Sequence, residues 1–254
     1  MKISTGLYFD RATTQLGNVQ GELATTQQQL STGKQIVKPS DAPDKAALVT
    51  RLESELSRQV GYQDTLKAVN VRLTAEETAL KNTSDVMYRI KELATQAAND
   101  TLSVQDRQSV ALELSNLKDQ VLSLANSQDS NGNYLFSGSR AGSPAFGKDA
   151  SGRVLYQGDQ ARMQVNVGDN RRMNMNMPGS DAFTRVVRDD GKGNKVGVDF
   201  FQSLDDLVNA VKSSDHKAIQ RGVTEVDMLQ NGVSEGLGQI GADLTVVDLQ
   251  TNVL

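Results

Sequence analysis

The chain contains no cysteine and no tryptophan, and aromatic residues make up only 4% of its 254 residues. The absence of cysteine excludes disulfides, thiolate metal sites and cysteine nucleophiles. Large globular cores use many aromatic rings, whereas narrow seams between helices are built from Leu, Val, Ile and Ala. We therefore expect long packed helices rather than one large globular core.

The sequence also lacks the features that bind nucleic acid and those that insert into a membrane. Its formal net charge is −4, and it has no concentrated stripe of Lys and Arg of the kind that neutralises phosphates. No apolar run is long enough to cross a bilayer, and the first 20 residues lack the apolar core and cleavage site of a signal peptide. We expect no nucleic-acid partner, no membrane partner, and a protein that is either cytoplasmic or exported by another route.

Long helical repeats dominate what is present. Between residues 45 and 99, eleven positions alternate by three and four, and nine of them are apolar or aromatic. They are Tyr62, Leu66, Val69, Leu73, Glu76, Leu80, Thr83, Met87, Ile90, Ala94 and Ala97. This spacing predicts a long coiled-coil helix, which needs partner helices to cover its seam.

Two further segments repeat with the same spacing and supply these partners. Residues 103–126 follow a short link, and the Ser103 and Asp106 pair is typical of a helix N-terminus. Residues 217–254 form the third repeat, which is still running at Leu254 without a closing Gly or basic turn, so we expect the natural chain to continue. The three helices should form an antiparallel rod that buries, among others, Leu66, Leu73 and Leu117.

A change of pattern between the second and third repeats predicts a small β-rich insert. Residues 130–147 are dense in turn formers, and residues 163–177 alternate apolar and polar residues across a Gly-Asp-Asn turn, as in a β hairpin. A shorter helical stretch, residues 200–214, follows a loop at 191–197. We expect an insert of about residues 140–200 that buries its own face and is dispensable for folding of the rod.

The fold class expected is thus mainly α, an elongated antiparallel coiled-coil rod with a small β-rich insert. Residues 1–40 would be an N-terminal helix and connector, residues 41–139 and 201–254 the rod, and residues 140–200 the outer insert. The first segment has a helical seam but no complementary segment in the chain. It should remain mobile until neighbouring molecules cover it.

Two glycine motifs look like nucleotide sites but fail on context. Gly33 and Lys34 resemble the end of a P-loop, yet Gln28 and Gln35 stand where a Gly and a Ser or Thr are needed, and a helical repeat precedes them. Gly33 is better interpreted as the left-handed residue that ends a helix. The G-x-G-x-x-G match at 236–241 follows no strand and lies within the third repeat, so we expect a helix there.

Candidate metal and catalytic residues are equally weak. Met173, Met175 and Met177 could bind Cu(I), but a methionine stripe on a buried strand face is the commoner arrangement. Asp129 starts a calcium-like loop that lacks the required Gly and Glu. His216 is the only histidine, and we expect it to be solvated. The sequence therefore predicts no catalytic, cofactor-binding or metal-binding residues, and no cofactor.

Four blocks in order carry a family resemblance. They are "MKIST" at the start, "QQLSTGKQIVKPSDAPDKAA" at 28–47, the stretch 92–126, and "NGNYLFSGS" at 131–139. Together they resemble the flagellar hook-associated protein 3 family (FlgL), relatives of flagellin, and residues 156–183 are similar to the inserted domain of that family. The family usually has Ser-Asp-Asp-Pro where this chain has Ser40-Asp41-Ala42-Pro43, a change that should leave the role at a helix start intact.

The resemblance implies a structural protein, not an enzyme, at the junction between the flagellar hook and the filament. Such a protein is exported unfolded by the flagellar type III apparatus, which would explain the missing signal peptide, and is located outside the cell in the flagellum. In the family, helices from both chain ends pair in an innermost layer, the long helices form the next layer, and the insert lies outermost.

The partners implied by the resemblance are hook-associated protein 1 on the hook side, flagellin on the filament side, and further copies in a ring. A flagellar export chaperone would bind through the C-terminal segment that we expect beyond Leu254. The alternative is that the chain is itself a flagellin, a subunit of the filament. A nucleotide-binding enzyme that uses residues 236–241 is the more distant possibility.

Overall fold

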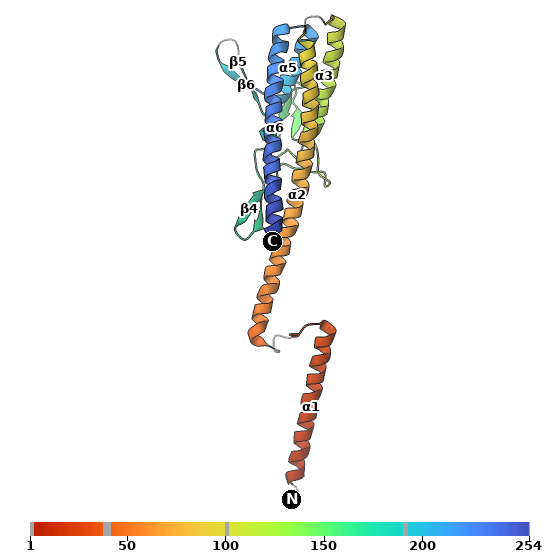
Figure 1. Cartoon of the computed structure of the whole chain (residues 1–254), viewed down its shortest axis with the longest axis vertical. Helices are drawn as coiled ribbons and strands as arrows, with labels where there is room; N and C mark the ends of the chain where they lie inside the picture. Colours follow the sequence, from red (N-terminus) through yellow and green to blue (C-terminus); the bar gives the residue numbers. More distant parts are fainter. Residues whose placement is uncertain (1–2, 38–41, 100–101, 190–192, 254) are drawn as a thin grey trace. The chain divides into compact units, whose positions relative to one another are not determined.

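The structure is a computed structural model that describes residues 3–37, 42–99, 102–189 and 193–253. Its helices are α1 (Ile3–Thr32), α2 (Pro43–Ala97), α3 (Val104–Ala125), α4 (Gly179–Ala182), α5 (Phe200–Ser213) and α6 (His216–Val253) (Figure 1). Its strands are β1 (Phe146–Lys148), β2 (Val154–Tyr156), β3 (Gln164–Gly168), β4 (Arg171–Asn174), β5 (Val186–Asp189) and β6 (Lys195–Val198). The contacts divide the chain into two units, with the division between Val60 and Gly61.

The first unit contains α1 and the beginning of α2. Gly33 follows the end of α1 with φ +66°, which confirms the prediction that it is the left-handed residue that ends this helix. At the start of α2, the backbone N–H groups of Lys45 and Ala46 donate to the carbonyl of Ala42. The predicted contribution of Ser40 and Asp41 to this start lies outside the described residues.

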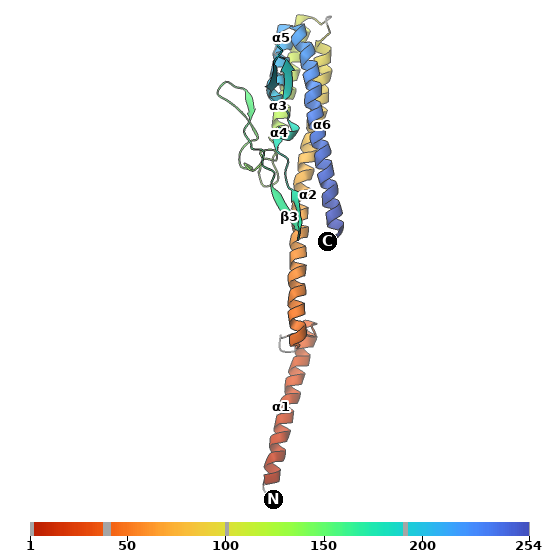
Figure 2. The same cartoon turned by 90° about the vertical axis from the view of Figure 1, so that its left-hand side faces the viewer.

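The second unit is a bundle in which α3, α5, α6 and the later part of α2 lie side by side (Figures 1 and 2). The long α2 seam is confirmed, because ten of its eleven predicted positions are buried and only Tyr62 is half-buried. Leu66 and Leu73 are each 1% exposed. Leu117, which we expected to be buried, is only partly so, because α3 turns Leu114 and Val121 into the core instead.

α5 is more central than the sequence predicts. It contacts both α3 and α6, and the side chains that it buries include two adjacent aromatic rings, Phe200 and Phe201. The sequence predicts a short helix here within the rod domain of residues 201–254, but it expects three other helices to form most of the rod. In the structure α5 fills the space between α3 and α6, so the bundle is built from four helices.

The connection from α2 to α3 is fixed by polar contacts. The hydroxyl of Ser103 accepts the backbone N–H of Asp106 at 3.2 Å and donates to the Asp106 carboxylate at 2.7 Å, which confirms the predicted N-cap. Arg107 is buried and donates to the carbonyls of Ala97 and Asn99 at 2.9 and 3.2 Å. The start of α3 is therefore tied directly to the end of α2.

The insert contains three separate two-stranded antiparallel hairpins, β1–β2, β3–β4 and β5–β6. The hairpin predicted from the alternation of residues 163–177 is confirmed as β3–β4, with Val165 opposite Met173 and the turn at Gly168 to Asn170. The other two hairpins have strands of three or four residues. The part of the chain that the structure describes contains no helix long and apolar enough to cross a membrane.

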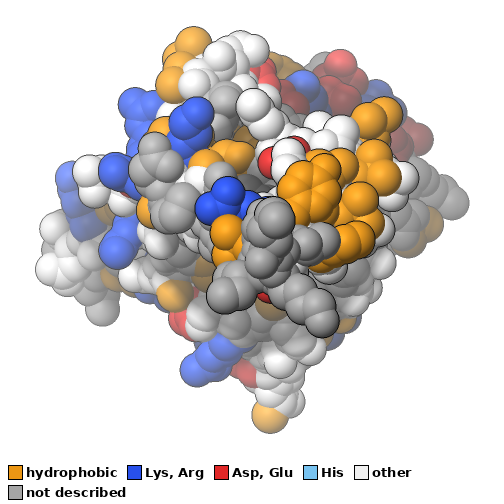
Figure 3. Space-filling view, turned by 90° about the horizontal axis from the view of Figure 1, so that it is seen from below, with side chains coloured by type: hydrophobic (Ala, Val, Ile, Leu, Met, Phe, Trp, Pro, Cys, Tyr) orange, Lys and Arg blue, Asp and Glu red, His pale blue; other side chains and the backbone are white. Residues whose placement is uncertain are grey.

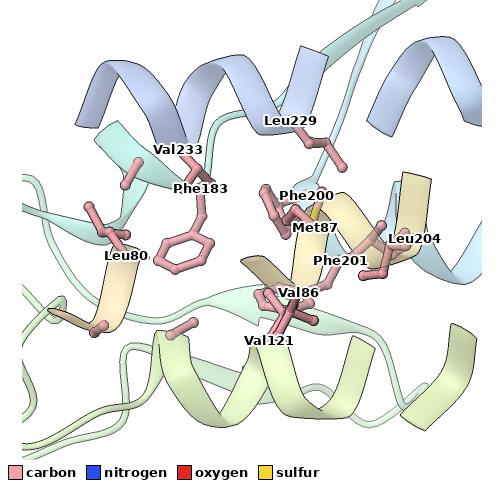
Figure 4. Close-up of a cluster of buried hydrophobic side chains, with 14 of the residues drawn as sticks. Leu80, Val86, Met87, Val121, Phe183, Phe200, Phe201, Leu204, Leu229 and Val233 are labelled. Atoms are coloured by element: carbon pink, nitrogen blue, oxygen red, sulfur yellow. The ribbon is translucent and has the colours of Figure 1, made fainter. Parts of the chain in front are cut away.

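Aromatic residues join the insert to the bundle, contrary to our expectation that the insert buries its face alone. Phe183 is 4% exposed, and its ring centroid lies 5.2 to 6.3 Å from those of Phe146, Phe200 and Phe201. Figure 4 shows its ring in the interior, beside Leu80 of α2 and between α6 and α3. The core of the second unit is thus continuous through bundle and insert.

Candidate assembly site

An uncovered apolar seam runs along α1. Its members are three, four or seven residues apart and so share one helix face, like the buried α2 seam, yet each residue is more than half exposed. They are Phe9 (66% exposed), Leu16 (64%), Val19 (57%), Leu23 (58%) and Leu30 (81%). Within the first unit, no described residue covers this seam.

The first turns of α2 carry a second exposed apolar face. Val49, Leu52, Leu56 and Val60 lie three or four residues apart and are 40 to 63% exposed. At the N-terminal end of α1, Figure 3 also shows hydrophobic side chains gathered at the surface. Contiguous exposed apolar surface typically marks an interaction site. Burying one Leu or Val side chain there stabilises the complex by about 1.5–3 kcal/mol.

α1 offers few charges to a partner. Asp10, Arg11 and Glu22 are the only charged side chains in the described residues of the helix. Several of its threonine hydroxyls donate to the carbonyl four residues earlier, as Thr13 does at 2.7 Å, so they do not require an outside partner. Recognition of α1 must therefore depend mainly on apolar packing along the seam.

In the second unit, the buried carboxyl group of Glu76 connects α2 to the insert. Glu76 and Arg72 are both buried, with Oε1 of Glu76 3.3 Å from Nε of Arg72. The other carboxylate oxygen accepts the backbone N–H of Met177 at 3.1 Å. Burial raises the pKa of Glu76 to about 8, against the opposing effect of Arg72. The contact fixes the insert on the helix at one defined register.

A second charged network fixes the β5–β6 hairpin. Arg188 donates to both carboxylate oxygens of Glu225 on α6, at 2.7 and 2.8 Å, and to Asp206 on α5 at 2.6 Å. Ser203 also donates to Glu225 at 2.7 Å. Hydrogen bonds to two carboxylates raise the pKa of Arg188 further above its usual value. The hairpin is therefore held by two helices at once.

The β3–β4 hairpin reaches the opposite end of the bundle. At its turn, the Asp169 carboxylate accepts the hydroxyl of Tyr62 on α2 at 3.0 Å. Gln250 on α6 donates to the carbonyl of Val167 at 3.3 Å and accepts from Arg171. The hairpin thus bridges α2 and α6 near the point where the second unit begins.

The candidate nucleotide motifs lie in ordinary helical positions. Residues 236–241 lie inside α6, which begins at His216, and no strand leads into them. Lys34 is exposed and lies 3.9 Å from the carboxylate of Glu53. Neither motif has the strand-to-helix turn that phosphate binding requires.

The candidate metal residues are also dispersed. Asp129 uses one carboxylate oxygen to accept the backbone N–H groups of Asn131 and Asn133, at 2.8 and 2.9 Å, so its loop is closed by its own hydrogen bonds. Met173 and Met177 are buried. Within the described ranges, no group of three or more His, Asp or Glu side chains gathers as a metal site would require.

The sequence offered a signal for only one of the two charged networks. Glu76 stands at an expected seam position, and Arg72 precedes it by four residues, so their pairing on one helix face could have been anticipated. Arg188 and Glu225 are 37 residues apart in different elements, and no local pattern relates them. Neither network was predicted as a site.

The packed bundle and the exposed α1 seam together define a coiled-coil type of helical protein with an unpaired helix face in its first unit. The profile of the bacterial flagellin N-terminal helical region matches residues 2–141, more than half of the chain. The chain belongs to this family, whose characterised members are structural flagellar proteins rather than enzymes.

Relatives of known identity narrow the comparison. The chain is 33% identical over 138 residues to flagellar hook-associated protein 3 of Salmonella typhimurium, an alignment that covers 54% of this chain and 44% of that protein. It is 32% identical over 124 residues to the flagellin FlaB1 of Treponema pallidum, covering 48% of this chain and 43% of that protein. The chain thus spans less than half the length of these curated relatives.

A solved structure confirms the predicted fold class. A protein of Vibrio parahaemolyticus, described as a flagellar hook-associated protein, is 25% identical with a TM-score of 0.74. The match covers 85% of this chain and 93% of that chain. The likeness therefore extends through the bundle and the insert, beyond the residues matched by the family profile.

Proposed function

We propose that the chain is a structural component of the bacterial flagellum that acts outside the cell at the junction between hook and filament. The carrying observation is the uncovered α1 seam, which has coiled-coil spacing and more than half of each apolar side chain exposed. Similarity to a hook-associated protein 3 supports the location. In this role the seam is covered on assembly by apolar helices that the described residues do not supply.

Three parts of the chain would take different places in the assembly. Residues 1–40 would form the innermost layer, residues 41–139 with 201–254 the next layer, and residues 140–200 the outer surface. The bundle and its insert are already packed, so they would join the assembly as a preformed body. The seam of α1 would be buried only on assembly, which links its ordering to the presence of neighbours.

The proposed partners follow from a position between two kinds of subunit. Hook-associated protein 1 would lie on the hook side, flagellin on the filament side, and further copies of the chain would complete a ring. A flagellar export chaperone would keep the protein unfolded before secretion by the type III apparatus. The low charge of α1 supports partners with complementary apolar helices.

Filament flagellin is the second candidate function, because the chain also matches a flagellin over nearly half its length. A complementation experiment separates the two. The full-length gene that encodes this chain would be expressed in a motile bacterium that lacks its junction protein but makes flagellin, and in a second strain that lacks only flagellin. We expect filaments to attach to hooks, seen by electron microscopy, in the first strain only. Filaments in the second strain alone would support flagellin and contradict the junction role.

A further inference from the structure

A fully buried carboxyl group stands at the boundary between bundle and insert. Glu76 occupies a seam position where a coiled coil normally has an apolar residue, and its side chain is 0% exposed. One oxygen accepts the backbone N–H of Met177 from the insert. The other oxygen has no hydrogen-bond partner, although Nε of Arg72 lies 3.3 Å away. The carboxyl group of Glu76, which joins bundle and insert, therefore has a hydrogen-bond partner for only one of its two oxygens.

The charged groups around Glu76 compensate its negative charge only in part. Arg72, on the same helix, is shared, since it also lies 3.7 Å from Asp129 and donates to the carbonyl of Leu135 at 2.9 Å. Asp243, which faces the site from α6, disfavours a second negative charge. A carboxylate at this position would lose its hydration without gaining a full set of donors.

We propose that Glu76 is a proton-dependent latch, whose neutral form holds the Met177 segment of the insert against the bundle and whose ionised form loosens that contact. A neutral carboxyl can remain buried while its carbonyl oxygen accepts the Met177 N–H. A carboxylate must instead recruit water, and water can reach it only if the covering segment moves away. The latch depends on contacts within the second unit and not on the proposed function.

The direction of the pH effect follows from the two protonation equilibria. In the closed state burial raises the pKa of Glu76 from 4.5 to about 8, whereas in an opened or unfolded state the pKa returns to its usual value. Between these values the closed state keeps a proton that the open state has lost. Opening therefore becomes about tenfold easier for each pH unit gained in this window, and stability falls as pH rises through it.

Hydrogen exchange at the Met177 amide measures the latch directly, because this amide donates to Glu76. The measured quantity is the protection factor, the exchange rate of an unstructured amide divided by the observed rate at the same pH. For the unmodified chain we expect the factor to fall by about tenfold per pH unit between about pH 5 and 8, and to level off above that. A factor that stays constant across this range would overturn the proposal, whatever the variants show.

Three variants test whether Glu76 is the responsible group. Glu76→Gln keeps an acceptor for Met177 but cannot ionise, so its profile should be flat. Glu77→Gln removes the neighbouring half-buried carboxylate that pairs with Lys81, and it should leave the slope unchanged. In Asp243→Asn the protection factor should stop falling at a lower pH, because the repulsion from Asp243 no longer raises the pKa of Glu76. A sloping profile in Glu76→Gln would show that another group controls the opening.

Discussion

The seams of α1 and α2 obey the same spacing rule and have opposite environments. Leu16 in α1 is 64% exposed, whereas Leu73 in α2 is 1% exposed. Both are leucines at three-four positions of long helices, so local sequence does not separate them. The difference is whether another described helix of the same unit covers the seam, and this distinguishes an exposed apolar surface from an internal core.

The two regions also differ in how they use polar groups. α1 has three charged side chains in its described residues and satisfies several of its hydroxyls along its own backbone. The second unit contains buried charged networks that connect helices to hairpins, such as the bidentate pair of Arg188 and Glu225. A buried charge needs fixed partners. The packed unit therefore has one defined arrangement, while the α1 seam stays exposed within its own unit.

Replacing one leucine by Asp in each seam should give the largest difference between the two regions in the free energy of unfolding. Leu73→Asp places an unpaired charge in the core and should lower the free energy of unfolding by about 3 kcal/mol or more. Leu16→Asp places the charge on an exposed surface and should change it by less than about 0.5 kcal/mol. Urea denaturation followed by circular dichroism measures both. Equal effects would show that the α1 seam is covered in the isolated chain.

Truncation of Phe183 tests whether the insert belongs to the core of the second unit. Phe183→Ala removes a ring that packs against four others and should cost about 3 kcal/mol. Val187→Ala, on the exposed side of the neighbouring strand, should cost less than about 0.5 kcal/mol. Deletion of residues 140–200 should lower the stability of the bundle. An unchanged melting curve after that deletion would restore the expectation of an independent insert.

Two glycines of α6 should respond in opposite directions. A methyl group at Gly232 would collide with the Thr184 side chain, so Gly232→Ala should cost about 1–3 kcal/mol. Gly241 has open space around it, so Gly241→Ala should stabilise the helix by up to about 1 kcal/mol. Thermal denaturation of the two variants compares them directly. Stabilisation by both would mean that the insert does not lie against α6 at Gly232.

The smallest expected effect is the loss of the α3 cap. Ser103→Ala removes the acceptor for the Asp106 N–H and should cost about 1 kcal/mol. Ser109→Ala, on an exposed face within the same helix, removes no cap and should be neutral or slightly stabilising. Differential scanning calorimetry can resolve the two. A similar decrease in both variants would indicate a general loss of polar surface contacts rather than of a cap.

Features encoded within a few consecutive turns could be predicted from the sequence. The α2 seam follows from apolar spacing, the Ser103 cap from two residues three positions apart, and the β3–β4 hairpin from alternation around the turn at 168–170. Each depends on interactions among neighbouring residues. The same reasoning explains why Gly33 was correctly interpreted as a helix terminator.

Features that depend on distant segments could not be predicted. The aromatic core joins Phe136, Phe146, Phe183 and the Phe200–Phe201 pair, whose positions along the chain have no common period. The central place of α5 and the attachment of the insert depend on this core. The exposure of the α1 seam was anticipated only because the chain has no matching fourth long repeat, an argument from the whole sequence rather than from the helix.

One measurement tests most directly the central claim that the α1 seam serves assembly rather than folding. The double variant Leu16→Asp and Leu23→Asp would be compared with Gln28→Asp, an exposed position on the opposite side of the same helix. Urea denaturation first confirms that each variant folds, and electron microscopy then counts the hooks that carry filaments in cells lacking the junction protein. We predict that both variants keep the stability of the unmodified chain, that the double variant loses filament attachment, and that Gln28→Asp keeps it. Normal attachment with the seam charged would contradict the account.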